Sequence, residues 1–242
     1  MKKKFLTLLS LFLSLAIQAQ EIYHDSVALA ILDKMSQTIG ELNSLRFTTQ
    51  TSQDVAFSKD YYIKEFKTGD YIFQGSDRLL AKTTQNGKDH FYLYDGTQIV
   101  YYSMEDNNYA AADAPSSTLE MLNWIDEDFG VQLVVADFLY PDFTSHLMEN
   151  MDYIEFLGKT EVNGEKLLHV GGSNASMTFQ IWVTQDLLMR PRRILLTYFG
   201  EPYSRQLEVE FDDWEINQVY PPSIFEFMPP PNSKQIIWTK KN

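Results

Sequence analysis

Apolar residues near the start of the chain recur every three to four positions. The apolar stripe consists of Val27, Ile31, Met35 and Ile39. This period is typical of an amphipathic helix, and Asp25 stands where an N-cap residue is expected. The spacing therefore predicts a helix over 25–42.

The apolar period then changes to two, and Gly, Asn and Asp residues separate the segments, which is the pattern of strands joined by short turns. A first meander is predicted with strands at 45–51, 60–67, 70–75, 79–85, 90–96, 97–104 and 107–113. A second is predicted with strands at 151–162, 165–172, 176–184, 192–199, 204–214 and 223–227, and a final short strand at 235–238. Asn163 and Gly164 are typical of a two-residue hairpin turn.

A helical insert, residues 116–141, separates the two meanders. Ser117 and Glu120 have the spacing of a capping box and predict a helix over 116–130. The almost wholly apolar segment 131–141 predicts a second helix that ends at Pro141. A helix that is apolar on most sides is buried or covers an apolar surface, so we expect this insert to cover the sheet.

These elements predict an α+β, mostly β fold. So many strands in one antiparallel sheet must curl, and the few helices cannot bury a separate core of their own. We therefore expect a single domain over 20–242: a strongly curved, half-open antiparallel β-barrel with helices over its concave face. Apolar faces on both sheet and helices leave room for a lined cavity.

The N-terminus has the order of a secretory signal peptide. Three lysines precede an apolar run from Phe5 to Ile17, which is too short to span a bilayer, and Ala19 and Gln20 follow. We expect a signal peptide at 1–19, with a cut after Ala19 or Gln20 and a periplasmic or secreted product without a transmembrane segment. The alternative is an uncleaved anchor. No cysteine is present, so the core must be stable without disulfides.

Charge and motif content narrow the classes of function. The formal net charge of −13 argues against nucleic acid and against docking on anionic lipid headgroups. The four histidines, His24, His90, His146 and His169, form no metal-binding motif, and no nucleophile or phosphate-loop motif occurs. We expect no cofactor, no metal and no catalysis. A hydrolase with paired carboxylates is the weakest alternative.

Several segments together resemble a known family. They are VVADFL (134–139), FLGKTEVNGEKLLHV (156–170), FQIWVTQ (179–185), PRRILLTY (191–198), FDDWEIN (211–217) and FEFMPPPNSKQI (225–236). In this order they resemble the predicted periplasmic proteins known as domain-of-unknown-function family twenty-ninety-two, a branch of the LolA-like superfamily of periplasmic lipoprotein carriers. The resemblance implies a curved half-barrel with a helical lid, and an apolar hollow that holds acyl chains or senses lipoproteins.

We therefore expect an exported binding protein, monomeric, that holds a lipid, an acyl chain or the acyl part of a lipoprotein in the concave face. The expected cavity lining is Leu45, Phe47, Phe73, Leu119, Leu122, Ile125, Phe129, Leu133, Phe138, Phe179, Ile181, Val183, Leu195, Leu207 and Val209. The alternative is a protein-interaction or sensor module whose hollow is filled by its own helices.

Three further features have two interpretations each. A symmetric hairpin around 200–202 would put Arg192 opposite Glu210 and Arg193 beside the apolar face, at the cavity rim or in a structural ion pair. The acidic run 126–128 is unfavourable at a helix C-terminus and indicates a solvated face, or a contact with a cation or partner. The prolines 229–231 indicate the end of a strand or, alternatively, a docking motif.

Overall fold

The structure is a computed structural model that describes residues 22–59, 61–131, 138–200 and 203–241. The predicted signal peptide lies outside this range. The strands of the described part form one 13-stranded sheet in the order β1-β8-β9-β10-β11-β12-β2-β3-β4-β5-β6-β7-β13. The central pairs are antiparallel, as predicted, whereas the two-residue edge strands β1 and β13 run parallel to their neighbours.

The strands of the first meander are β2 (Ser44–Ser58), β3 (Tyr61–Gln74), β4 (Arg78–Gln85), β5 (Lys88–Tyr94), β6 (Gln98–Ser103) and β7 (Asn108–Asp113). Those of the second are β8 (Tyr153–Val162), β9 (Glu165–Ser173), β10 (Met177–Thr184), β11 (Pro191–Tyr198) and β12 (Arg205–Ile216). The edge strands are β1 (Tyr23–His24) and β13 (Lys234–Gln235). Pairing between β12 and β2 joins the two meanders into one surface.

Both predicted helices with caps are present. Helix α1 (Ser26–Gly40) begins after Asp25, whose side chain accepts a hydrogen bond from the Val27 amide. Helix α2 (Thr118–Phe129) begins with the capping box and ends at Gly130, which has a positive φ of 71°. A third helix, α3 (Phe143–Asn150), was not predicted. Most of the predicted helix 131–141 lies outside the described residues.

The predicted break between strands 60–67 and 70–75 is wrong. These residues form a single strand, β3, because Gly69 continues the ladder instead of turning. A Cβ on Gly69 would collide with the ring of Tyr71, so glycine here makes room for that ring.

The predicted strand at 223–227 is also wrong. A 3-10 turn, Pro222–Ile224, changes the direction of the chain there, and the next residue, Phe225, is buried. The prolines 229–231 therefore do not end a strand. They lie in the connection to β13, where the Pro231 carbonyl accepts a hydrogen bond from the Asn107 side chain.

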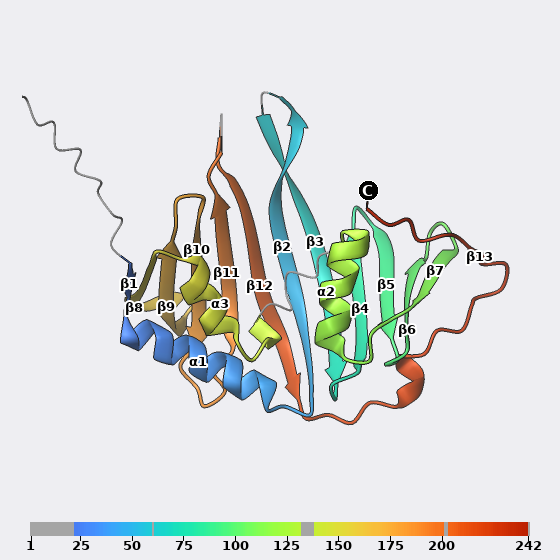
Figure 1. Ribbon diagram of the computed structural model, residues 1–242, viewed down its shortest axis with the longest axis horizontal. Helices are drawn as coiled ribbons and strands as arrows, with labels where there is room; N and C mark the ends of the chain where they lie inside the picture. The colour runs from blue at the N-terminus through green and yellow to red at the C-terminus, as the bar shows by residue number, and fades with distance from the viewer. Residues whose placement is uncertain (1–21, 60, 132–137, 201–202, 242) are drawn as a thin grey trace, which may run out of the picture.

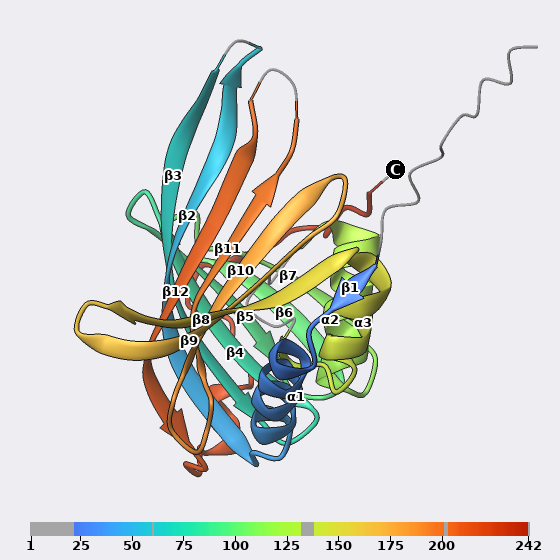
Figure 2. The ribbon, with the colours of Figure 1, turned by 90° about the vertical axis from the view of Figure 1, so that its left-hand side faces the viewer.

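The sheet is strongly curved but not closed, and the helices lie on its concave side. Figures 1 and 2 show α1 across one end of the strands, with α2 and α3 over the two halves of the sheet. The β2–β3 and β11–β12 hairpins project beyond the other end. The predicted class, a mostly β half-barrel with a helix-covered concave face, is confirmed.

Candidate functional site

The concave face of β2 to β6 is graded in polarity along the strands. Four rows of residues cross the strands in register. The first row is Leu45, Phe73, Leu79, Tyr94 and Ile99; the second is Phe47, Tyr71, Ala81, Tyr92 and Tyr101; the third is Thr49, Gly69, Thr83, His90 and Ser103; and the fourth is Thr51, Lys67 and Gln85. The face thus changes from apolar at the α1 end to hydroxyl and charged groups at the projecting end.

The concave face of β10 to β12 is apolar as far as Leu196 and Leu207, and the next pair toward the projecting end is Tyr198 and Arg205. Alternate residues of these strands face the core, as the period of two requires. The buried or partly buried set is Phe179, Ile181, Val183, Ile194, Leu196, Leu207, Val209 and Phe211. The apolar surface of β10 to β12 therefore extends further toward the projecting end than that of β2 to β6, since Leu207 lies opposite Gln53 and Val209 opposite Thr51.

The centre of the concave face is filled by aromatic side chains. Phe47 has no exposed surface, and its ring lies 5.9 Å from that of Phe138, 5.6 Å from that of Phe211 and 4.9 Å from that of Trp214. Phe138, which belongs to the helical insert, is also fully buried. Among the described residues, these rings occupy the middle of the half-barrel, and open space is found beside them at the margin of the helical cover.

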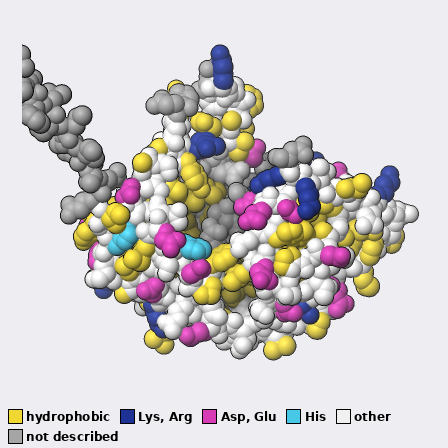
Figure 3. Space-filling model, in the orientation of Figure 1, with side chains coloured by type: hydrophobic (Ala, Val, Ile, Leu, Met, Phe, Trp, Pro, Cys, Tyr) yellow, Lys and Arg dark blue, Asp and Glu magenta, His cyan; other side chains and the backbone are white. Residues whose placement is uncertain are grey.

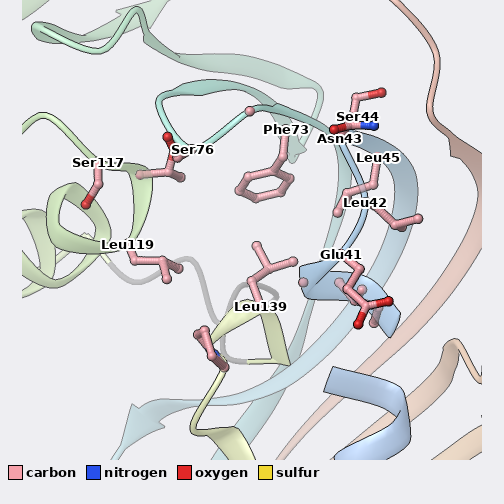
Figure 4. Close-up of a pocket in the computed structure, with 15 residues that line it drawn as sticks. Glu41, Leu42, Asn43, Ser44, Leu45, Phe73, Ser76, Ser117, Leu119 and Leu139 are labelled. Atoms are coloured by element: carbon pink, nitrogen blue, oxygen red, sulfur yellow. The ribbon is translucent and has the colours of Figure 1, made fainter. Parts of the chain in front are cut away.

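One such space is a cavity of 420 Å³ at the α1 end, which we call the lid pocket. Its wall is apolar, from Ile39, Leu42, Leu45, Phe73, Leu119 and Leu139. Figure 4 shows Phe73, Leu119 and Leu139 pointing toward the space from β3, α2 and the residues after α2. Glu41, Asn43, Ser44, Ser76, Ser117 and Thr118 add polar groups. An apolar wall with a few polar groups is the usual composition of a small-molecule site.

The predicted lining residues have four different positions. Leu45, Phe73 and Leu119 line the lid pocket. Most of the others pack in the core around it: Phe47, Leu122, Ile125, Phe129, Phe138, Phe179, Ile181, Val183, Leu207 and Val209. Leu133 lies outside the described residues, and Leu195 lies on the opposite face of the sheet. The role of these residues in ligand binding stays a prediction.

The predicted register of the β11–β12 hairpin is wrong by one residue. Arg193, not Arg192, lies opposite Glu210, and Leu195 lies opposite Glu208. A shift of one residue moves every side chain to the other face of the sheet. Arg193 therefore does not stand at the cavity rim but forms ion pairs with Glu208 and Glu210, while Ile194 and Leu196 face the core in place of Leu195.

The acidic end of α2 meets the C-terminal segment of the chain, residues 234–241, which we call the strap. Lys240 Nζ lies 2.5 Å from an Asp128 carboxylate oxygen, and Lys241 Nζ donates to the Asp126 carbonyl at 2.9 Å. Trp238 packs on Phe129 with ring centroids 4.9 Å apart. The cation that the acidic run indicated thus comes from the chain itself, and it offsets the negative end of the helix dipole.

Burial and hydrogen bonding affect individual ionisable side chains of the concave face. Burial raises the pKa of Tyr92 to about 12. His90 Nδ1 and the Tyr101 hydroxyl are 2.9 Å apart. Within the described residues, no three His, Cys, Asp or Glu side chains come together as a metal site would need. The described part of the face offers apolar contact and hydrogen-bonding groups.

The hollow of the concave side is visible on the surface. Figure 3 shows hydrophobic side chains inside the depression between the two helical covers, and acidic side chains around it. No helix within the described ranges is long and apolar enough to cross a membrane.

The family described as "Predicted periplasmic protein (DUF2092)" matches residues 28–238. The chain belongs to this family. The match confirms the resemblance seen in the sequence and the predicted periplasmic location of this DUF2092 protein. A search of curated proteins gives no match.

Several solved structures are similar to this DUF2092 protein at low identity. An uncharacterized conserved protein from Thermus thermophilus is 9% identical with a TM-score of 0.51, over 87% of this chain and 99% of that one. The Mycobacterium tuberculosis lipoprotein LppX is 12% identical with a TM-score of 0.48, over 79% and 96%. A LolA superfamily protein from Nitrosomonas europaea is 10% identical with a TM-score of 0.37, over 83% and 97%.

Proposed function

We propose that this DUF2092 protein is a periplasmic, non-catalytic binding protein that holds an apolar or acyl-bearing ligand, a lipid or the acyl part of a lipoprotein, between its concave face and its helical cover. The observation that carries the proposal is the lid pocket. It opens beside the apolar end of β2 and β3, and its volume of 420 Å³ lies in the range of small-molecule sites.

Burial of the acyl chain would supply the binding free energy. Each methylene removed from water contributes about 0.8 kcal/mol. The lid pocket by itself takes only part of a long chain, so a longer ligand needs the insert with α2 and Phe138 to move away from Phe47 and Phe211. Such a movement opens the filled centre and joins it to the pocket.

The rival function is a protein-interaction or sensor module with a permanently filled hollow. The specific observation in its favour is the packed aromatic centre around Phe47. The two functions differ in one measurable respect: a carrier takes up an acyl ligand in its concave face, whereas an interaction module leaves the centre closed.

The test is native mass spectrometry of the protein purified from a bacterial periplasm, with organic extraction of co-purifying lipids. Binding of a fluorescent fatty acid, cis-parinaric acid, is then measured on delipidated protein. Leu119→Trp fills the lid pocket without adding charge, and Leu187→Trp is the matched control because Leu187 is 92% exposed. We expect Leu119→Trp alone to lose bound lipid; a protein that neither carries nor takes up an acyl ligand would refute the carrier function.

A further inference from the structure

Lys67 differs from the other cations of this acidic protein. Most arginines and several lysines in the described ranges form ion pairs. Some described lysines and arginines form no ion pair. All of these are exposed except Lys67. It is partly buried on the concave face of β3, and burial lowers its pKa. A buried cation without a counter-ion is unfavourable unless something compensates it.

The side chain of Lys67 lines a small cavity at the polar end of the graded face. Thr51 and Gln53 on β2, Glu65 and Phe66 on β3 and Gln85 on β4 line the same cavity, whose volume of about 20 Å³ must grow when a ligand opens the cover. The Glu65 carboxylate does not pair with Lys67; it accepts a hydrogen bond from Gln85 Nε2 at 2.7 Å. The Lys67 ammonium, with three donor hydrogens, thus has no ion-pair partner among the described residues, and the lining of the cavity adds the Thr51 hydroxyl and the Gln53 amide.

The position of this cavity fits a ligand with two unlike ends. Lys67 and Phe73 are six residues apart on β3, which corresponds to roughly 20 Å along a strand. Between them the face passes from apolar side chains through phenols to hydroxyls, with Phe138 covering the second row at Phe47. A ligand lying along β2 and β3 would meet apolar contacts at one end and a cation at the other.

We propose that Lys67, with Thr51 and Gln53, forms a subsite for the anionic headgroup, a carboxylate or phosphate, of an amphipathic ligand whose acyl chain runs along β2 and β3 toward the lid pocket. The inference rests on the proposed binding function and adds to it the ligand class and its orientation. A charge-assisted hydrogen bond from the ammonium compensates the buried cation and selects acidic over neutral lipids. Glu65 lines the same cavity and is held by Gln85, and its negative charge disfavours headgroups with more than one negative charge.

The test compares ligands that differ only in the headgroup. Delipidated protein is titrated at neutral pH with cis-parinaric acid and with its methyl ester, which keeps the chain and loses the charge. The variants are Lys67→Gln and, as the control, Lys166→Gln, an exposed lysine on β9 with the same loss of charge. We expect the wild-type protein and the control to bind the acid at least about tenfold more tightly than the ester, and Lys67→Gln to bind both alike, which is the loss of one charge-assisted hydrogen bond.

The outcomes separate the two proposals. Binding of neither ligand to wild-type protein refutes the carrier function. Equal binding of acid and ester to wild-type protein, or a preference for the acid that survives Lys67→Gln, refutes the headgroup subsite but leaves the carrier function intact. Inorganic phosphate is the third ligand, and its binding is measured by calorimetry. If phosphate binds as tightly as the acid, the site takes free anions, and the proposal of an amphipathic ligand is refuted.

Discussion

Replacement of Phe138 by alanine tests whether the helical cover is closed on the sheet. Phe138 has no exposed surface, and its ring centroid lies 5.3 Å from that of Phe211 and 6.2 Å from that of Trp214. The variant removes the aromatic contacts that hold this part of the insert on the sheet. It leaves an apolar hollow bounded by Phe47, Phe211 and Trp214.

The magnitude follows from the burial. A fully buried phenylalanine truncated to alanine costs about 3–5 kcal/mol of unfolding free energy, through lost transfer energy and an unfilled cavity. A domain of this size loses roughly 2–4 °C of Tm for each kcal/mol, so we expect a fall of roughly 6–20 °C. Phe138→Leu keeps much of the volume and is expected to cost less than about 1.5 kcal/mol.

The assay is urea unfolding followed by near-UV circular dichroism, together with thermal unfolding. Phe57→Ala is the control, because Phe57 is 62% exposed near the tip of β2, and we expect it to stay within about 0.5 kcal/mol of wild type. A dry apolar cavity of this kind binds benzene, so added benzene should raise the Tm of Phe138→Ala more than that of Phe57→Ala. If Phe138→Ala lowers the unfolding free energy no more than Phe57→Ala does, the aromatic centre is not packed in solution.

Three further predictions concern other parts of the fold. Gly69→Ala should lower the unfolding free energy by about 1–3 kcal/mol in a denaturant titration, because the new Cβ collides with the Tyr71 ring. Burial lowers the pKa of His169 below its unfolded value near 6.5, so the unfolded state binds more protons at acidic pH. The Tm should therefore fall as the pH drops below about 6.5. His169→Gln should flatten this part of the plot of Tm against pH, and an unchanged plot would contradict the assignment to His169. Joint replacement of Lys240 and Lys241 by glutamine should speed hydrogen exchange in the last turn of α2 severalfold without changing α1; equal exchange in both helices would show that the strap does not hold α2.

Local signals in the sequence predicted most elements of the fold. The capping box at Ser117 and Glu120 and the Asp25 cap mark helix starts because they satisfy backbone groups within a few residues. The Asn163–Gly164 turn marks a hairpin for a similar reason, since both residues adopt the positive φ that such a turn requires. Such features depend on neighbours in the chain, so the chain alone reveals them.

Features that depend on distant residues were missed. Glycine is common in turns, but Gly69 lies within a strand and makes room for the ring of Tyr71. The face of Arg193 depends on a register that differs by one residue from that of a symmetric hairpin. The lid pocket needs the end of α1 beside the start of α2, although the whole first meander separates them in the chain. No period or motif in the sequence encodes that proximity. Individual apolar residues of the lid pocket, such as Leu45 and Leu119, could be predicted, but the pocket itself could not.

The acidic run at the end of α2 shows how a local conflict in a sequence can point to a tertiary contact. Acidic groups there oppose the helix dipole, and the strap resolves the conflict with Lys240 and Lys241. The same strap pairs with β7 through β13 and so covers an otherwise open edge of the sheet. Edge protection and attachment of α2 therefore depend on one segment. If α2 moves to admit a ligand, its contacts with Lys240, Lys241 and Trp238 must break or move with it, whereas the backbone pairing of Lys234 and Gln235 with β7 lies elsewhere on the strap, so the edge can stay covered.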